Sequence, residues 1–173
     1  GIVCSSIMFT ASFEALYSAF TRMREQQTWS TMLNAPLNVD DIVLGEIAFA
    51  ATKGAFSGVA ILLVAAAAGL VAGPAALWVL PLLLVIGLCF GALAMVITAV
   101  APGYDFFLYY FTLVLTPMLL LSGVFFPLSE LPGAVVAAAH VLPLVHAVAI
   151  VRPLMTGGIP ADVLLHLVVI LAW

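Results

Sequence analysis

Few side chains in this sequence could do chemistry, and their spacing favours neither a metal site nor a catalytic site. The three histidines are His140, His146 and His166, and no His-x-x-x-His or Glu-x-x-His pair relates them. Zinc sites need three or four converging ligands, so no metal site is predicted. An intramembrane enzyme with His140, His146 and Glu130 as candidate groups stays a minor alternative. Pro132 interrupts any helix between Glu130 and His140, so no regular spacing places them on one face.

The composition points to a membrane protein. Hydrophobic residues make up 66% of the 173 residues and charged residues 7%, whereas soluble domains carry roughly 25% charged residues. Eight of the twelve charged residues lie between Glu14 and Lys53. The net charge of −4 offers no basic stripe for nucleic acid. Cys4 and Cys89 lie in apolar runs and are interpreted as small buried hydrophobes.

The uncharged stretches predict an all-α integral membrane protein. Residues 54–104 carry no charge and as one helix would measure roughly 76 Å, more than twice the bilayer core of about 30 Å. The segment must therefore fold back, and Gly73-Pro74 is the natural break, with a second turn at Ala101-Pro102-Gly103. The predicted spans are about 1–20, 47–72, 76–100, 106–126 and a truncated 163–173. This pattern is interpreted as a fragment that lacks an upstream helix and the end of the last one.

The long polar stretch, residues 22–46, is predicted to be a structured loop. Trp29, Met32 and Leu33 follow i, i+3, i+4 spacing, which indicates a short amphipathic helix. Asn38 is then predicted to cap the next helix. The simplest interpretation is a helix that lies on the membrane surface, with Trp29 as its interfacial anchor.

Basic residues predict the orientation. Arg22, Arg24 and Lys53 lie on one side, and Arg152 lies alone on the other, so the 22–46 loop is predicted to be cytoplasmic. Residues 122–155 are rich in proline and glycine but otherwise apolar, too broken for a plain span. They are predicted to form a re-entrant helical hairpin on the outer side, because irregular backbone survives at that depth only where protein buries it.

Glu14, Tyr109 and Tyr110 are candidate residues of a transport pathway. Ionisable groups inside a span usually face protein or water. Glu14 would then line a pathway entrance, or it would simply be wetted near the cytoplasmic interface. The tyrosines belong to an aromatic cluster, residues 104–111, for which an aromatic belt is the plain explanation.

Two signatures in the chain resemble those of type-2 ATP-binding-cassette exporter permeases. The first comprises Leu120-Leu121-Ser122-Gly123-Val124-Phe125-Phe126-Pro127, Leu131-Pro132, Pro143-Leu144-Val145-His146 and Arg152; the second is the loop Tyr17–Trp29 with Leu33–Leu37. In detail the loop is most similar to the nodulation-protein-J subgroup, permeases of lipo-chitooligosaccharide exporters. The resemblance covers nearly the whole chain.

This resemblance implies a six-helix permease subunit in the bacterial inner membrane, surrounded by lipid and paired with a second copy. A cytosolic ATP-binding subunit would dock on a coupling helix at 22–34, and the outer hairpin at 122–155 would close the exit. The docking residues would be Arg22, Arg24, Glu25, Trp29, Met32 and Leu33. Four hairpin residues, Pro127, Pro143, His146 and Arg152, are predicted to be structural, capping broken helix ends, with cargo contact by His146 and Arg152 as the alternative.

No enzymatic activity or cofactor is expected in this chain itself. It lacks a Gly-x-x-x-x-Gly-Lys-Ser/Thr loop, so ATP and magnesium would bind the partner subunit. The cargo that the resemblance implies is a lipo-chitooligosaccharide or a similar amphiphilic glycolipid. Glu14 would then line the entrance for its sugar headgroup, and stacking on its sugar or acyl chain is the alternative role of Tyr109 and Tyr110. An exporter of a drug, polysaccharide or lipid from the same superfamily is the alternative. A proton-coupled secondary transporter is less favoured, because no internal repeat is found.

Overall fold

The structure is a computed structural model that describes residues 1–125 and 133–173. These two ranges contain helices and no β-strand, which confirms the all-α prediction for them. The α-helices are α1 (Ile2–Phe13), α2 (Thr28–Met32), α3 (Val39–Ala67), α4 (Val79–Val100), α5 (Asp105–Tyr110), α6 (Thr116–Leu121), α7 (Gly133–Ala139), α8 (Pro143–Met155) and α9 (Val163–Ala172). The π-helical turns Glu14–Ser18 and Thr21–Glu25 prolong α1, Phe111–Leu115 joins α5 to α6, and the 3₁₀ turn Pro74–Trp78 precedes α4.

Three helical segments in the described ranges are long and apolar enough to cross a membrane. They are Ile2–Glu25 with 24 residues, Val39–Ala67 with 29 and Pro74–Val100 with 27. A helix needs about 20 residues to cross the hydrocarbon core. Three shorter apolar helical segments follow, Asp105–Leu121, Pro143–Met155 and Val163–Ala172.

The ends of α3 show what the local sequence controls. Asn38 is the N-cap, and its backbone N–H donates to the Asp41 carboxylate at 2.9 Å. The helix ends at Ala67, five residues before the end of the predicted span, because Gly69 adopts φ +71°. Glycine takes this left-handed conformation without a Cβ clash, and the Leu70 N–H donates back to the carbonyl of residue 65 at 2.9 Å.

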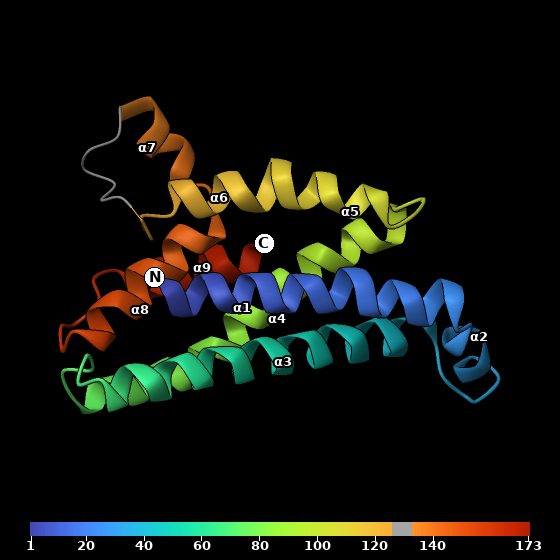
Figure 1. The fold of residues 1–173 in the computed structure, drawn as a ribbon, viewed down its shortest axis with the longest axis horizontal. Helices are drawn as coiled ribbons and strands as arrows, with labels where there is room; N and C mark the ends of the chain where they lie inside the picture. The colour runs from blue at the N-terminus through green and yellow to red at the C-terminus, as the bar shows by residue number, and fades with distance from the viewer. Residues whose placement is uncertain (126–132) are drawn as a thin grey trace.

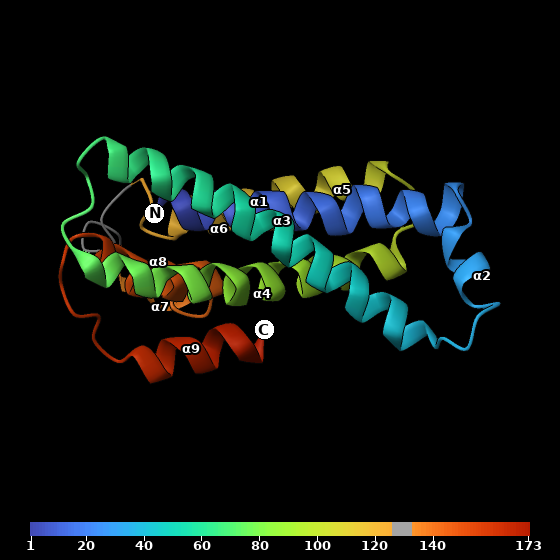
Figure 2. The ribbon, with the colours of Figure 1, turned by 90° about the horizontal axis from the view of Figure 1, so that it is seen from below.

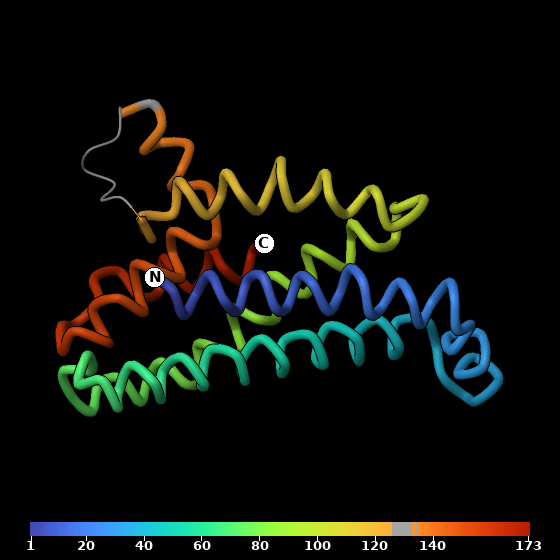
Figure 3. Tube along the Cα trace, viewed as in Figure 1, coloured from blue at the N-terminus to red at the C-terminus, as the bar shows by residue number. Residues whose placement is uncertain are grey.

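The long helices form an antiparallel bundle with two distinct ends. Figure 1 shows α1 and α3 side by side, and Figure 2 shows α4 beside both. The short helix α2 and the α4–α5 turn lie at one end of the trace in Figure 3, and the α3–α4 link, α7 and α8 lie toward the other. Contacts support this arrangement: the Thr21 and Tyr104 hydroxyls lie 2.8 Å apart, and the Ala72 N–H donates to the Met155 carbonyl at 3.0 Å.

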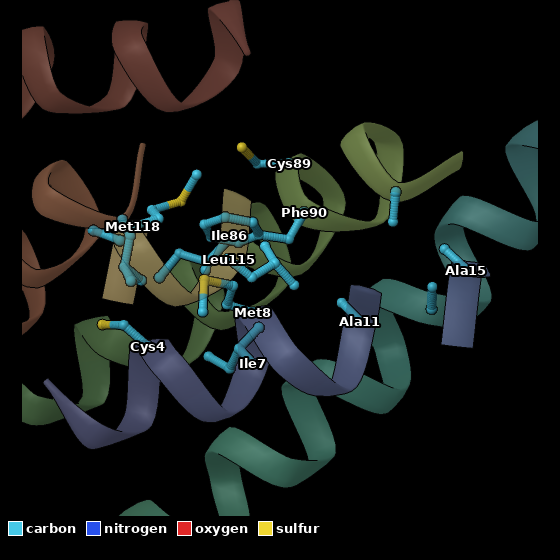
Figure 4. Packing of buried hydrophobic residues seen from close by; sticks show 14 of the residues in the cluster. Cys4, Ile7, Met8, Ala11, Ala15, Ile86, Cys89, Phe90, Leu115 and Met118 are labelled. Atoms are coloured by element: carbon cyan, nitrogen blue, oxygen red, sulfur yellow. The ribbon is translucent and has the colours of Figure 1, made fainter. Parts of the chain in front are cut away.

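The core lies where α1 meets α4 and the segment from Phe111 to Leu121. Figure 4 shows α1 side chains pointing toward Ile86 and Phe90 of α4 and toward Leu115 and Met118. All four of these residues are buried. The contributing α1 residues are Cys4, Ile7, Met8 and Ala11, all fully buried. Both cysteines, Cys4 and Cys89, are buried free thiols, as predicted.

Small residues let α3 approach its two neighbours closely. An added Cβ at Gly54 would lie 3.1 Å from the Ile7 side chain of α1. At Gly87 of α4 an added Cβ would lie 2.8 Å from the Ala51 backbone of α3. In lipid, helices associate through such close packing, because burial of apolar surface gives little drive there. The Gly54-x-x-x-Gly58 and Gly87-x-x-x-Gly91 spacings therefore mark the contact faces.

The segment predicted as an outer hairpin contains α7 and α8. Most of α8 is buried, and it packs on α9, α1 and α4. Pro143 is its first residue, a position that needs no N–H donor. Pro127 and the signature residues Leu131-Pro132 lie outside the described residues. The depth of this segment in a membrane stays a prediction.

Candidate functional site: a buried ion-pair cluster beside a short exposed helix

Two carboxylates and two cations meet between α1 and α3. Glu14 and Arg22 lie on the prolonged first helix, and Glu46 and Lys53 lie two turns apart on α3. Spacings of seven and eight residues return to nearly the same helical face. Both pairs therefore point into the seam between the two helices.

Arg22 bridges the two carboxylates. Its Nε donates to Glu46 Oε1 at 2.8 Å, and its Nη2 donates to Glu46 Oε2. The same Nη2 donates to Glu14 Oε1 at 3.1 Å. A guanidinium fork matches a carboxylate in this two-point geometry, so Arg22 fixes both the position and the orientation of Glu46.

Lys53 completes the cluster on the far side of Glu14. Its Nζ lies 2.5 Å from Glu14 Oε2, which also accepts the Ser18 hydroxyl at 3.0 Å. The Glu14 side chain is only 5% exposed, whereas that of Lys53 is 50% exposed. The cluster carries two positive and two negative charges. Each buried carboxylate is therefore paired with a cation, which offsets the cost of removing it from water.

The sequence analysis predicted Glu14 either at a pathway entrance or wetted at the interface. The structure places it in an ion-pair cluster with Arg22, a predicted docking residue, and with Glu46 and Lys53, which the sequence did not identify as site residues. The signal that could have found them is the seven-residue spacing of Glu46 and Lys53 on a helix that is otherwise uncharged after Asp41. Intramembrane charges of opposite sign usually pair.

The cluster also holds the short helix α2. The indole Nε1 of Trp29 donates to Glu46 Oε1 at 3.2 Å. Gln27, in the left-handed region with φ 54°, separates α2 from the first helix. The predicted coupling helix at 22–34 is therefore split: Arg22, Arg24 and Glu25 end the first helix, and α2 is a separate five-residue helix.

The six predicted docking residues divide into two groups. Arg22 and Trp29 are partly buried and both face Glu46. The other four are solvent-facing or nearly so: Arg24, Glu25, Met32 and Leu33. A hollow of about 400 Å³ between α2 and α3 is lined by Arg22, Met32, Leu37, Asp41, Ile42, Gly45, Glu46 and Phe49. The exposed surface beside this hollow is therefore apolar at Met32 and Leu33 and charged at Arg24 and Glu25.

The two candidate pathway tyrosines face different surroundings. Tyr109 is 61% exposed, while Tyr110 is buried. In the described part of the chain, Glu14 bonds to Ser18, Arg22 and Lys53, so the structure does not join these tyrosines to it. Other aromatic rings do form a continuous array beside Glu14: Phe9, Phe13 and Tyr17 of the first helix against Tyr104, Phe107 and Phe111.

At the other end of the bundle, His146 and Arg152 bond to backbone carbonyls just past helix ends. His146 Nε2 lies 2.7 Å from the His140 carbonyl after α7, and Arg152 Nη2 donates to the Gly123 carbonyl after α6. These are the contacts that a capping role requires, because the last carbonyls of a helix lack helical partners. Neither contact excludes a cargo role.

His146 and His166 meet although no sequence spacing relates them. Their Nδ1 atoms lie 2.6 Å apart, and the His146 ring is almost fully buried. Because a carbonyl only accepts, His146 Nε2 carries a proton, and with a neutral His146 ring the donor between the two Nδ1 atoms is His166. Within the described residues no group of three metal-ligating side chains converges.

Comparison with known proteins places the chain in a family. The model of the ABC-2 type transporter family matches residues 1–156. Nodulation protein J of Rhizobium meliloti (strain 1021) is 45% identical over 167 residues, 96% of this chain and 64% of the relative. Nodulation protein J of Rhizobium leguminosarum bv. trifolii is 48% identical over 166 residues, 96% of this chain and 63% of the relative.

A more distant relative, nodulation protein J of Azorhizobium caulinodans, is 29% identical over 158 residues, 91% of this chain and 62% of the relative. The chain thus spans about 64% of the length of the first of these curated relatives. No solved structure matches it significantly. The predicted resemblance is confirmed, and with its apolar helices the chain belongs to the ABC-2 type transporter family as a multi-pass membrane protein.

Proposed function

We propose that this chain is the membrane-spanning part of a permease subunit of an ATP-driven exporter, moving a lipo-chitooligosaccharide or a similar amphiphilic glycolipid out of the cell. The observation that carries the proposal is the likeness to relatives named nodulation protein J over 96% of the chain, within the ABC-2 transporter family. The complete protein has six membrane-spanning helices, lies in the bacterial inner membrane and works as a pair of permease copies. The family likeness supports an exporter; the cargo rests on the subgroup alone.

A cytosolic subunit binds and hydrolyses the ATP, with magnesium, and docks on α2. The supporting observation is the pair of exposed apolar side chains, Met32 at 40% and Leu33 at 43% exposed, on a helix fixed through Trp29 and Glu46. Apolar groups held rigidly at an exposed position suit insertion into a partner's groove. In this arrangement the 22–46 loop is cytoplasmic, and the 122–155 hairpin closes the exit on the outer side.

Co-purification of the full-length protein with its ATP-binding subunit tests the docking. We expect a Met32→Ala/Leu33→Ala double variant to lose most of the bound subunit, because the docking groups are removed while α2 stays attached. Trp29→Ala should also lose it, because α2 is released from Glu46. Leu44→Ala, which changes a 64% exposed leucine early in α3, is the matched control and should retain the subunit. Retention by all three variants, or purification of wild-type protein without such a subunit, would contradict the proposal.

The second candidate function is export of another cargo: a drug, a polysaccharide or a lipid. The match to the ABC-2 type transporter family supports it equally, because that match does not specify a cargo. ATP-dependent uptake into inside-out vesicles separates the two. Accumulation of a labelled lipo-chitooligosaccharide supports the first candidate. Uptake of other amphiphiles without it supports the second.

A further inference from the structure

A hollow between α1 and α3 combines aromatic and charged walls. It has a volume of about 340 Å³ and is lined by Phe9, Thr10, Phe13, Glu14 and Lys53. Small-molecule pockets commonly measure about 300–1,000 Å³. The hollow is therefore large enough for one compact polar group, such as a sugar ring.

Lys53 indicates that this face does not rest against hydrocarbon. It lies seven residues, roughly 10 Å, further along α3 than Glu46, inside a helix long enough to span the membrane. Its side chain is 50% exposed. Charged groups inside a span face protein or a water-filled cavity, because exposure to hydrocarbon is costly. Protein, water or a polar occupant must therefore cover the hollow, and its volume suits a polar occupant.

The charge balance selects an uncharged occupant. Glu14 is paired with Lys53 at 2.5 Å and with Arg22 at 3.1 Å, so its charge is already neutralised. An anionic or cationic ligand would have to compete with these short pairs. An ammonium group has three donors, so Lys53 can hold Glu14 and still donate to a neutral ligand's hydroxyl or amide oxygen.

The aromatic wall supplies flat apolar faces beside this polar edge. Phe9 and Phe13 are four residues apart on one face of α1, and both pack against Phe111, with ring centroids 6.2 Å and 5.6 Å away. One face of the Phe13 ring stacks on Tyr17, with centroids 4.5 Å apart, and Phe13 as a whole remains 54% exposed. An aromatic face carries partial negative charge and attracts weakly positive hydrogens. The C–H face of a pyranose ring offers such hydrogens, while its rim offers hydroxyl groups.

We propose that this hollow binds the neutral sugar headgroup of the transported glycolipid, with the Phe13 ring against the sugar face and Lys53 donating to its oxygens. The proposal rests on the proposed function for the identity of the cargo. Phe9, Phe13 and Lys53 then bind the cargo, and the role of Glu14 is to hold Lys53 in place.

Uptake kinetics test this assignment in inside-out vesicles that contain the full-length protein and its ATP-binding subunit. Phe13→Leu and Lys53→Met should each raise the KM for a labelled lipo-chitooligosaccharide about tenfold, equal to about 1.4 kcal/mol, with kcat unchanged. Phe13→Trp, which keeps an aromatic face, should stay within about twofold of wild type. Phe56→Leu is the matched control, since Phe56 is a 72% exposed aromatic residue on α3 outside the hollow.

A competition assay identifies which part of the cargo binds. Chitotetraose, which has no acyl chain, should inhibit wild-type uptake and should inhibit the Phe13→Leu variant about tenfold less strongly. Inhibition by free fatty acid that depends on Phe13, without inhibition by chitotetraose, would overturn the proposal in favour of an acyl-chain contact. Wild-type KM values in both Phe13→Leu and Lys53→Met would mean that other protein covers the hollow, and would also overturn it.

A direct binding measurement distinguishes failure of the sugar site in the hollow from failure of the exporter function. If wild-type vesicles take up no lipo-chitooligosaccharide, the exporter assignment fails by itself. Chitotetraose binding to the purified full-length protein in lipid nanodiscs then decides about the hollow. A Kd that rises about tenfold in Phe13→Leu and is restored in Phe13→Trp supports the site, and no measurable binding to the wild type refutes it.

Discussion

At the residue scale, one guanidinium makes two buried carboxylates tolerable. Glu14 and Glu46 are 5% and 9% exposed, and Arg22 contacts both. Removing one partner of a buried ion pair leaves an uncompensated charge, which typically costs about 3–5 kcal/mol. Glu14 keeps Lys53 if Arg22 is lost, whereas among the described residues Glu46 keeps only the Trp29 indole. Glu46 is therefore the residue most dependent on Arg22.

Replacing Arg22 tests this dependence. Arg22→Met should lower the free energy of unfolding of the solubilised protein by about 3 kcal/mol, because Glu46 stays buried without a cation. The double variant Arg22→Met/Glu46→Gln should recover most of that loss, because the uncompensated charge is gone. Thermal unfolding in detergent gives the comparison. Arg24→Met, at an exposed position of the same turn, should change little. A double variant no more stable than Arg22→Met would refute the explanation.

At the element scale, the position of α2 depends on its surroundings. A helix of five residues is far below the length at which isolated helices are stable in water. The Trp29–Glu46 bond and the backbone turn at Gln27 hold it against the ion-pair cluster. Movement of α2 would therefore be transmitted to both α1 and α3 through Arg22.

The close contact between α3 and α4 depends on the absence of a Cβ at Gly87. Gly87→Ala would place a Cβ 2.8 Å from the Ala51 backbone, which cannot rotate away. We expect a loss of about 1–3 kcal/mol, since overpacking forces the helices apart. Thermal unfolding of the solubilised protein measures it. Gly45→Ala on α3 has open space around the new methyl group and should be neutral or stabilising by up to about 1 kcal/mol. Equal effects of the two substitutions would contradict the packing argument.

At the scale of the whole molecule, the bundle separates two kinds of polar surface. The Arg22–Glu46 region lies at the same end as the α4–α5 turn, and the His146 and Arg152 contacts lie toward the other end (Figure 1). We propose that in a membrane these ends face opposite aqueous phases. Docking of an ATP-binding subunit and closure of an exit would then occur on opposite sides.

Cysteine labelling tests this polarity. Asn34→Cys and Gly103→Cys should both react with a membrane-impermeant maleimide in inside-out vesicles, and Gly73→Cys should react in intact cells. The native Cys4 and Cys89 are 0% and 6% exposed, so their background labelling should be low. Labelling of positions 34 and 103 from opposite sides would contradict the arrangement of the helices.

Elements whose causes are local could be predicted from the sequence. Long uncharged runs require helices in lipid, and the Asn38 cap and the breaks at residues 73 and 102 follow from short-range backbone chemistry. The signature residues were enough to predict the family. The end of α3 was missed by five residues because Gly69, within an alanine-rich run, was not recognised as the stop signal.

Tertiary structure decided which distant side chains meet. The Glu14–Arg22–Glu46–Lys53 cluster and the His146–His166 contact join residues up to 39 positions apart, as in the Lys53–Glu14 pair. These contacts between helices depend on how α1, α3 and α4 are rotated about their axes and shifted along them. The small residues on their contact faces set that rotation and shift. A one-residue rotation turns a side chain about 100° around its axis, so the partner of a buried charge is fixed only when the helices pack.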